Sequence, residues 1–82
     1  MPIVKITTQL RGCQRMTYGG VPFENGMSVE IMDPDLHPKS GKNYFNTSNV
    51  KLIANAFVQK YGPKYSILKY DFIREHMIAE IL

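Results

Sequence analysis

Cysteine is almost absent from this sequence, since its 82 residues include a single one, Cys13. One thiol cannot form an intrachain disulfide, and it cannot supply a cysteine-based structural zinc site. The chain is also too long and too poor in cysteine to be a disulfide scaffold. A reducing compartment is therefore its expected location.

Long hydrophobic runs are absent as well. No apolar run approaches the length of about 18 residues that a membrane-spanning helix needs. Residues Met1 to Leu10 alternate in character and include one lysine, unlike the basic start and continuous apolar stretch of a signal peptide. These absences predict a cytoplasmic protein with no membrane association.

Acidic residues are missing from the middle of the chain. Between Leu36 and Tyr70 the sequence has six lysines and no aspartate or glutamate, whereas the segments before and after carry net charges of −1 and −2. The whole chain has a net charge of +3. This basic middle is the strongest compositional bias of the sequence, and its members are Lys39, Lys42, Lys51, Lys60, Lys64 and Lys69.

Size and composition indicate one small globular domain that spans residues 1–82. The chain is 44% hydrophobic and 21% charged, which is typical of a soluble globule. A chain this short has room for one core. Monomers of this size rarely enclose a ligand pocket of about 300–1,000 Å³, so we expect a dedicated cavity only at an oligomer interface.

The N-terminal half has the alternating pattern of β-strands. Residues 3–10 place Val4, Ile6, Thr8 and Leu10 on one face, which predicts a strand. A second short strand is predicted at Gln14 to Tyr18. Gly19-Gly20 separates it from Val21 to Glu24, which Pro22 restricts to an edge or irregular segment.

Asn25-Gly26 is the clearest local turn signal. Both residues tolerate a positive φ, which a type I′ hairpin turn requires. The residues from Met27 to Ile31 then alternate as a half-buried strand. We therefore predict that Asn25-Gly26 joins two paired strands and that the N-terminal half is an antiparallel meander.

The strongest helix signal lies in the second half. A polar loop is predicted at Asp33 to Ser48, in which Tyr44-Phe45 either adds a short strand or pins the loop to the core. Ser48 or Asn49 is the expected N-cap of a helix over residues 49–61. Its apolar stripe is Val50, Ile53, Ala54, Phe57, Val58 and Tyr61. Gly62-Pro63 predicts where that helix ends.

The tail admits two interpretations. Asp71 could cap a terminal helix, or a short helical turn near Asp71 to Glu75 could lead into a final strand; we favour the strand. The predicted fold is α+β, a small antiparallel β-sheet or partly open barrel packed against one main α-helix. The predicted core is Val4, Ile6, Val29, Ile31, Ile53, Phe57 and Phe72.

Two short motifs carry one resemblance. The segment Glu24 to Ile31, followed by a loop and a helix that ends with residues 57–62 (Phe-Val-Gln-Lys-Tyr-Gly), is similar to small uncharacterised proteins of Bacteroidetes conjugative and other mobile elements. The similarity covers the chain from Pro22 onward. It implies a terminal strand and a mobile-element context, and it implies no chemistry because the function of those proteins is unknown.

A second resemblance lies at the N-terminus. The segment Met1 to Ile6 resembles the opening of the tautomerase superfamily, in which a terminal proline amine acts as general base. The resemblance would make Pro2 that base and Arg11 a substrate-binding residue. The superfamily continues with a long helix directly after this strand, whereas here Gly19-Gly20 and a hairpin signal follow.

Other chemistry-bearing residues have simpler structural interpretations. Asp33, Asp35 and His37 alternate but lack the spacing of an EF-hand, which favours a turn with solvated acids over a metal site. Cys13 lies between Arg11 and Arg15, which could activate its thiol, although a half-buried strand residue is the simpler interpretation. We predict no catalytic residue, no metal and no cofactor.

The basic middle supports one candidate binding site. Lysines bind phosphates as point charges and aromatic rings can stack on bases, so a nucleic-acid surface would consist of Lys42, Lys51, Lys60, Lys64, Tyr44 and Tyr65. Lys51, Asn55 and Gln59 would share one polar helix face. The alternatives are that this face is only solvated and that the aromatic residues belong to the core.

The sequence therefore predicts a non-enzymatic binding or accessory module. Its expected partner is an unidentified protein or a second copy, bound through exposed apolar residues such as Met16, Tyr18 or Phe23. The alternatives are weak, non-specific nucleic-acid binding through residues 39–69 and an N-terminal-proline tautomerase.

Overall fold

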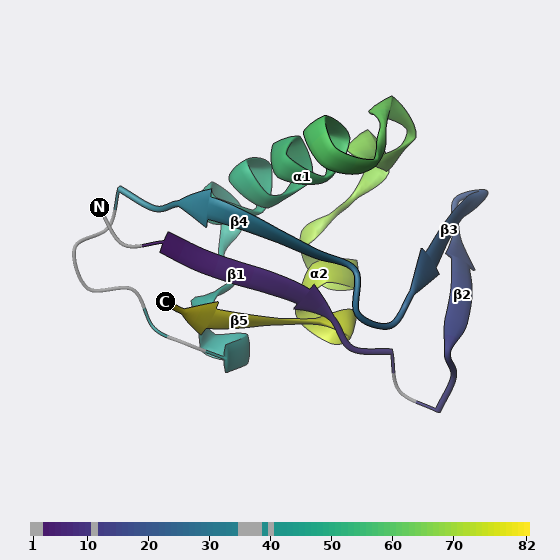
Figure 1. Cartoon of the computed structure of the whole chain (residues 1–82), viewed down its shortest axis with the longest axis horizontal. Coiled ribbons are helices and arrows are strands. Elements are labelled where there is room, and N and C mark those ends of the chain that lie inside the picture. The colour runs from purple at the N-terminus through teal and green to yellow at the C-terminus, as the bar shows by residue number, and fades with distance from the viewer. Residues whose placement is uncertain (1–2, 11, 35–38, 40) are drawn as a thin grey trace.

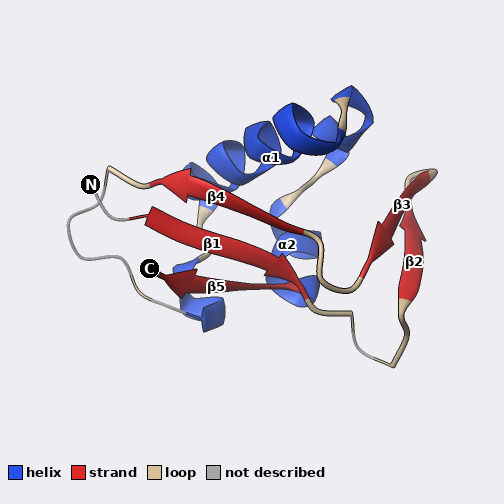
Figure 2. Ribbon diagram, in the orientation of Figure 1, coloured by secondary structure: helices blue, strands red, loops and turns tan. Residues whose placement is uncertain are grey.

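A three-stranded sheet and a separate two-stranded hairpin organise the chain. The computed structural model describes residues 3–10, 12–34, 39 and 41–82. Together with its main helix, the arrangement confirms the predicted α+β fold (Figures 1 and 2). The elements in chain order are β1 (Ile3–Thr8), β2 (Arg15–Tyr18), β3 (Val21–Glu24), β4 (Ser28–Met32), the 3-10 helix η1 (Gly41–Tyr44), α1 (Thr47–Tyr61), the 3-10 helix η2 (Pro63–Ile67), α2 (Tyr70–His76) and β5 (Met77–Ile81).

The larger sheet, which we call the main sheet, has the order β4-β1-β5. Strand β1 is antiparallel to both of its neighbours. The predicted alternation holds, because Val4, Ile6 and Thr8 are buried while the side chains between them are half-buried or exposed. Helix α1 packs against β4 and helix α2 against β5, and in Figure 1 the strands pass in front of α2.

The other side of the main sheet is uncovered by any described element. We call it the open face. Every side chain on it is exposed or half-buried, in contrast to the buried residues of the helix-covered face. The open face consists of Ile3, Lys5 and Thr7 from β1, Ser28, Glu30 and Met32 from β4, and Ile78, Glu80 and the adjoining Leu82 from β5.

The hairpin turn lies at Gly19-Gly20. Both residues have a positive φ, 56° and 81°, a backbone conformation that glycine adopts at no steric cost. Strands β2 and β3 pair across it, and Pro22 lies on an edge strand as predicted. The type I′ turn predicted at Asn25-Gly26 is wrong, since β3 and β4 belong to different sheets and Asn25 has no positive φ. The predicted meander is therefore wrong as well.

Instead of forming that turn, Asn25 links two segments of the chain through the hydrogen bonds of its side-chain amide. Its side-chain oxygen accepts a hydrogen bond from the Leu10 backbone N–H at 2.6 Å, and its amide nitrogen donates to the Cys13 carbonyl at 3.0 Å. The backbone N–H of Asn25 donates to the Gln14 carbonyl at 3.0 Å. Asn25 therefore ties the end of the hairpin to the segment that follows β1, which returns the chain to the main sheet.

Helix α1 begins earlier than predicted, and its N-cap is Asn46. The Asn46 side chain accepts hydrogen bonds from the backbone N–H groups of Ser48 at 2.8 Å and Asn49 at 2.9 Å, and Asn49 returns one by accepting from the Asn46 N–H at 2.8 Å. This reciprocal pair is a capping box, with Asn49 in the place usually taken by Glu or Gln. The expectation that Ser48 or Asn49 caps the helix is therefore wrong. The predicted end is confirmed at Gly62, whose φ is 125°.

The tail adopts the interpretation that the sequence analysis favoured. Residues Tyr70–His76 form the short helix α2, and Met77–Ile81 form β5 at the edge of the main sheet. Within β5, Met77 and Ala79 are buried and Ile78 and Glu80 are exposed, so the period-two alternation decides the structure. The chain thus ends beside its own first strand.

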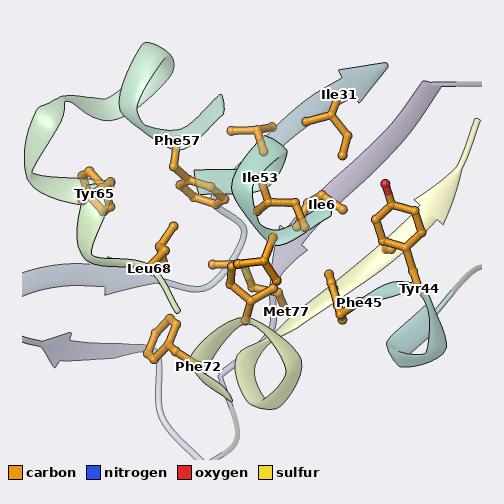
Figure 3. Packing of buried hydrophobic residues seen from close by; sticks show 14 of the residues in the cluster. Ile6, Ile31, Tyr44, Phe45, Ile53, Phe57, Tyr65, Leu68, Phe72 and Met77 are labelled. Carbon is orange, nitrogen blue, oxygen red and sulfur yellow. The ribbon is translucent and has the colours of Figure 1, made fainter. Parts of the chain in front are cut away.

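One hydrophobic core lies between the main sheet and the helices. Tyr44 and Phe45 from the η1 region close it at one end, and Tyr65 and Leu68 close it at the other (Figure 3). Tyr44-Phe45 thus pins the loop to the core, as one of the two interpretations expected. All the predicted core residues are buried, namely Val4, Ile6, Val29, Ile31, Ile53, Phe57 and Phe72.

Phe57 is the test of the helix face assignment. Its side chain is 0% exposed, so Phe57→Ala should lower the free energy of unfolding by about 3–5 kcal/mol, which approaches the whole stability of a small domain. Lys51 is exposed on the opposite face, so Lys51→Ala should change it by less than about 0.5 kcal/mol. Urea denaturation measures both, and equal midpoints for the two variants would refute the assignment.

Candidate functional site

The predicted basic residues lie on α1 and η2, apart from one in η1. Lys51 is exposed on α1 with Asn55 and Gln59, so the predicted polar face exists. Lys60 is near the end of α1, and its Nζ donates to the Ser28 carbonyl at 2.6 Å. Lys64 lies in η2 with its Nζ 5.6 Å from the centre of the Tyr65 ring. The side chain of Lys42 lies outside the described part of the structure.

The aromatic members of the predicted site are core residues. Tyr44 and Tyr65 are only 3% and 5% exposed, so their rings present no free face for a base. The Tyr44 hydroxyl donates to the Asp33 carboxylate, and the Tyr65 hydroxyl donates to the Pro22 carbonyl at 2.7 Å. The structure therefore places Lys51, Lys60 and Lys64 on α1 and η2, and the Tyr65 ring, although close to Lys64, is buried and offers no surface to a base.

An open groove of about 560 Å³ runs between β4 and α1. Its rim is polar and carries charges of both signs. The groove is a surface feature and not an enclosed pocket. Its lining residues are Lys5, Ser28, Val29, Glu30, Ala56, Gln59 and Lys60.

Side chains of helix α1 form hydrogen bonds with the outer edge of β4 at its first residue, beside this groove. The Ser28 backbone N–H donates to the Tyr61 hydroxyl at 3.1 Å, and the Tyr61 hydroxyl donates to the Ser28 carbonyl at 3.2 Å. Lys60 donates to the same carbonyl. Because these side chains satisfy the edge groups of Ser28, an added strand could not pair along the whole of β4.

The open face is the other accessible surface, and the strand registers order it into rows. One row is charged, because Lys5 is directly opposite Glu30 on one side and Glu80 on the other. A second row is apolar: Ile3 is opposite Met32, and the backbone N–H of Leu82 donates to the Ile3 carbonyl at 2.9 Å. The third row contains Ser28, Thr7 and Ile78.

The charged row has no ion pair of its own. Within the described ranges the structure records an ion pair between Arg15 and Glu24, with an N–O distance of 3.5 Å, and none that involves Lys5, Glu30 or Glu80. These three side chains therefore face solvent with one positive and two negative charges in a line.

The apolar residues that the sequence analysis named for partner binding are not the exposed ones. Phe23 is fully buried, and Met16 and Tyr18 are half-buried against the core. The Tyr18 ring lies 4.4 Å from the Phe72 ring, measured between centroids. The expected exposure of Phe23 is therefore wrong, because the hairpin turns this ring inward against the rings of η2 and α2. Partner binding through the half-buried Met16 and Tyr18 stays a prediction.

Sequence reasoning missed the open face, although a signal existed. Met32, Ile78 and Leu82 are large apolar residues at positions that the alternation of their strands assigns to the solvent side. The pairing β4-β1-β5 was needed to place them together, and it joins the two ends of the chain.

The described residues offer few candidates for a catalytic or metal-binding site. The described residues contain no group of three His, Cys, Asp or Glu side chains that could hold a metal ion. Asp35 and His37 lie outside these residues, as do Pro2 and Arg11, which the tautomerase resemblance would use. After β1 the described chain forms a hairpin and not the long helix that this resemblance implies. Cys13 is exposed and free.

Comparison with family models, curated proteins and solved structures finds no match to this chain. The two resemblances described above therefore stay predictions. In the part of the chain that the structure describes, no helix has the length and apolar character needed to cross a membrane.

Tyr65 provides a test of how its buried hydroxyl contributes to stability. Burial raises the pKa of Tyr65 above the ordinary value of about 10, and the nearby Tyr61 and Glu24 raise it further. The folded chain therefore keeps this proton when the unfolded chain has lost it. The contribution of Tyr65 is fully present below about pH 10 and is lost as the pH rises through the folded-state pKa.

We expect Tyr65→Phe to lower the free energy of unfolding at neutral pH by about 0.5–1.5 kcal/mol, because the bond to Pro22 is lost. The variant should also lose less stability than the parent above pH 10, as measured by chemical denaturation at a series of pH values. Tyr70→Phe, at a half-buried ring, is the control. An alkaline decline equally steep in the parent and in Tyr65→Phe would contradict this assignment.

Proposed function

We propose that this chain is a non-enzymatic, cytoplasmic protein-interaction module that binds its partner through the open face. The observation that carries the proposal is where the exposed apolar side chains lie. Of the five large hydrophobic residues exposed in the described part of the chain, four lie on the open face and one, Leu52, lies on α1. The four are Ile3, Met32, Ile78 and Leu82, with exposed fractions of 43%, 59%, 38% and 60%.

The usual pattern of a one-sided sheet makes this concentration informative. An antiparallel sheet with one solvated face normally carries polar residues there. Isolated exposed apolar residues are common, but a cluster framed by charged groups marks an interaction surface. Here Ile3, Met32 and Leu82 adjoin one another in a row that is bordered by the charged row of Lys5, Glu30 and Glu80.

A displayed-peptide selection tests the proposal. Peptides selected on the dilute parent chain should bind through the open face, so the double variant Met32→Lys/Ile78→Thr should weaken their binding at least about tenfold, because charge and lost apolar area both oppose docking. Both substitutions are at exposed positions, and thermal melts verify that the variant folds.

Leu52→Lys is the matched control, since it removes the exposed apolar residue that lies outside the open face. It should leave peptide binding unchanged. Selected peptides that bind the double variant as tightly as the parent would overturn the open face as the interaction surface.

A second candidate function rests on the basic middle of the chain. Lys51, Lys60 and Lys64 are all exposed on α1 and η2, and residues 36–70 contain six lysines and no acid, although Glu30 of β4 lines the same groove as Lys60. This arrangement favours weak contact with the phosphates of a nucleic acid. Since Tyr44 and Tyr65 are buried, the contact would lack aromatic stacking from these two residues.

Fluorescence anisotropy with a labelled single-stranded oligonucleotide tests this second candidate. Three phosphate contacts predict a log–log salt slope of about −2, because counterion release contributes about 0.7 per contact on single strands. Lys51→Glu/Lys60→Glu should abolish binding, and a thermal melt verifies that the variant folds, since Lys60→Glu also removes the hydrogen bond to the Ser28 carbonyl. No binding at low salt, where charges are least screened, would retire the nucleic-acid function.

A further inference from the structure

We propose that the partner of the open face is a second copy of this chain, docked face to face with an offset of one strand. The proposal rests on the proposed function, because it names the occupant of the same surface. It follows from the order of the rows on that face. Within the charged row the sign of the charge alternates from one strand to the next, and along the strands an apolar row, the charged row and the third row follow one another.

The charged row excludes a docking without offset. A two-fold axis parallel to the strands keeps each row opposite the same row of the second copy. If the axis passed over β1, Lys5 would meet Lys5 of the second copy, and like charges in close contact oppose association. A shift of the axis to midway between β1 and β4 instead places each β1 opposite the β4 of the other copy.

With this offset every row is self-complementary. Lys5 faces Glu30 of the second copy, and the symmetry repeats that pair, as in any isologous interface. In the apolar row Ile3 faces Met32, and in the third row the hydroxyl of Thr7 faces that of Ser28. Sheets that pack face to face lie about 10 Å apart, which long side chains such as Lys, Glu, Met and Ile can span.

The offset toward β4 also gives Lys60 an acidic neighbour. Beyond β4 lies the groove that Lys60 and Gln59 line. The same two-fold axis carries β5 of the second copy over that groove, with Glu80 on its exposed side. Lys60 and Glu80 of the second copy, neither of which takes part in the Lys5–Glu30 pair, are therefore brought toward each other.

The contact area sets the expected strength. Three strands about 4.8 Å apart and about five residues long present a face of roughly 14 by 17 Å. A single pair of such faces is smaller than a standard interface, so the dimer should be weak, with a Kd above about 1 µM. Concentrated samples are needed to populate it.

Charge-swap complementation, read by sedimentation equilibrium up to millimolar concentration, tests the proposal. The parent should dimerise, and Lys5→Glu and Glu30→Lys should each raise the dimer Kd at least about tenfold, because each places like charges face to face. An equimolar mixture of the two variants should dimerise again, since both cross-copy pairs then have opposite signs. Thermal melts verify that each variant folds.

Glu80→Lys is the matched control, because its exposed carboxylate belongs to the same row but does not face Lys5 in this arrangement. Mixed with Lys5→Glu, it should fail to restore the dimer. Restoration by Glu80→Lys and not by Glu30→Lys would overturn the offset, and a dimer insensitive to both single variants would overturn the surface.

A parent that stays monomeric at all concentrations would overturn the second copy as the partner. The peptide selection distinguishes that result from failure of the proposed function. If open-face variants still lose peptide binding, the face binds another protein; if they do not, both proposals fall.

Discussion

Thr8, the last residue of β1, holds the start of β4 in place through four hydrogen bonds to residues 24–27. Its backbone N–H donates to the Met27 carbonyl at 2.8 Å, and its carbonyl accepts from the Gly26 N–H at 3.2 Å. Its buried hydroxyl accepts from the Met27 N–H at 2.9 Å and donates to the Glu24 carbonyl. Because the chain leaves for the hairpin directly after β1 and must return beside it, these bonds determine where β4 starts and therefore its register.

That register has consequences on both faces of the sheet. On the covered face, Ile6 pairs with Val29 and Ala79, so the central residue of the core has an apolar neighbour on each side. On the open face, the same register aligns Lys5 with Glu30 and Glu80. A slip by one residue would exchange these two sets, because side chains alternate with a period of two. Core packing and the order of the rows are therefore set together.

The sequence predicted the fold class, the burial of the core, the end of α1 and the final strand, since each depends on local periodicity or on a glycine. It failed where two local signals competed. Asn25-Gly26 and Gly19-Gly20 both favour a hairpin turn, and the pairing of β2 with β3 selects the second. Asn46, Ser48 and Asn49 all suit an N-cap, and the reciprocal bonds of Asn46 and Asn49 decide between them.

Of the predicted site, the exposed lysines on α1 were predictable, but the burial of Tyr65 depends on Pro22, far away in the sequence. The open face was out of reach because it joins residues from both ends of the chain.

The open face also follows from how few elements the described residues provide. A sheet buries its apolar residues by packing against another layer, and α1, α2 and η2 supply one layer on one side. An average helix takes about 11–12 residues, and the described connections between the elements of this chain are all shorter than that. The described chain therefore has no segment left to form a second layer. A residue with no layer to meet should be polar, which is the case for Lys5, Thr7, Ser28, Glu30 and Glu80. Met32 and Leu82 at the same sheet end are instead the most exposed large apolar residues described, and a layer docked on this face would remove them from water.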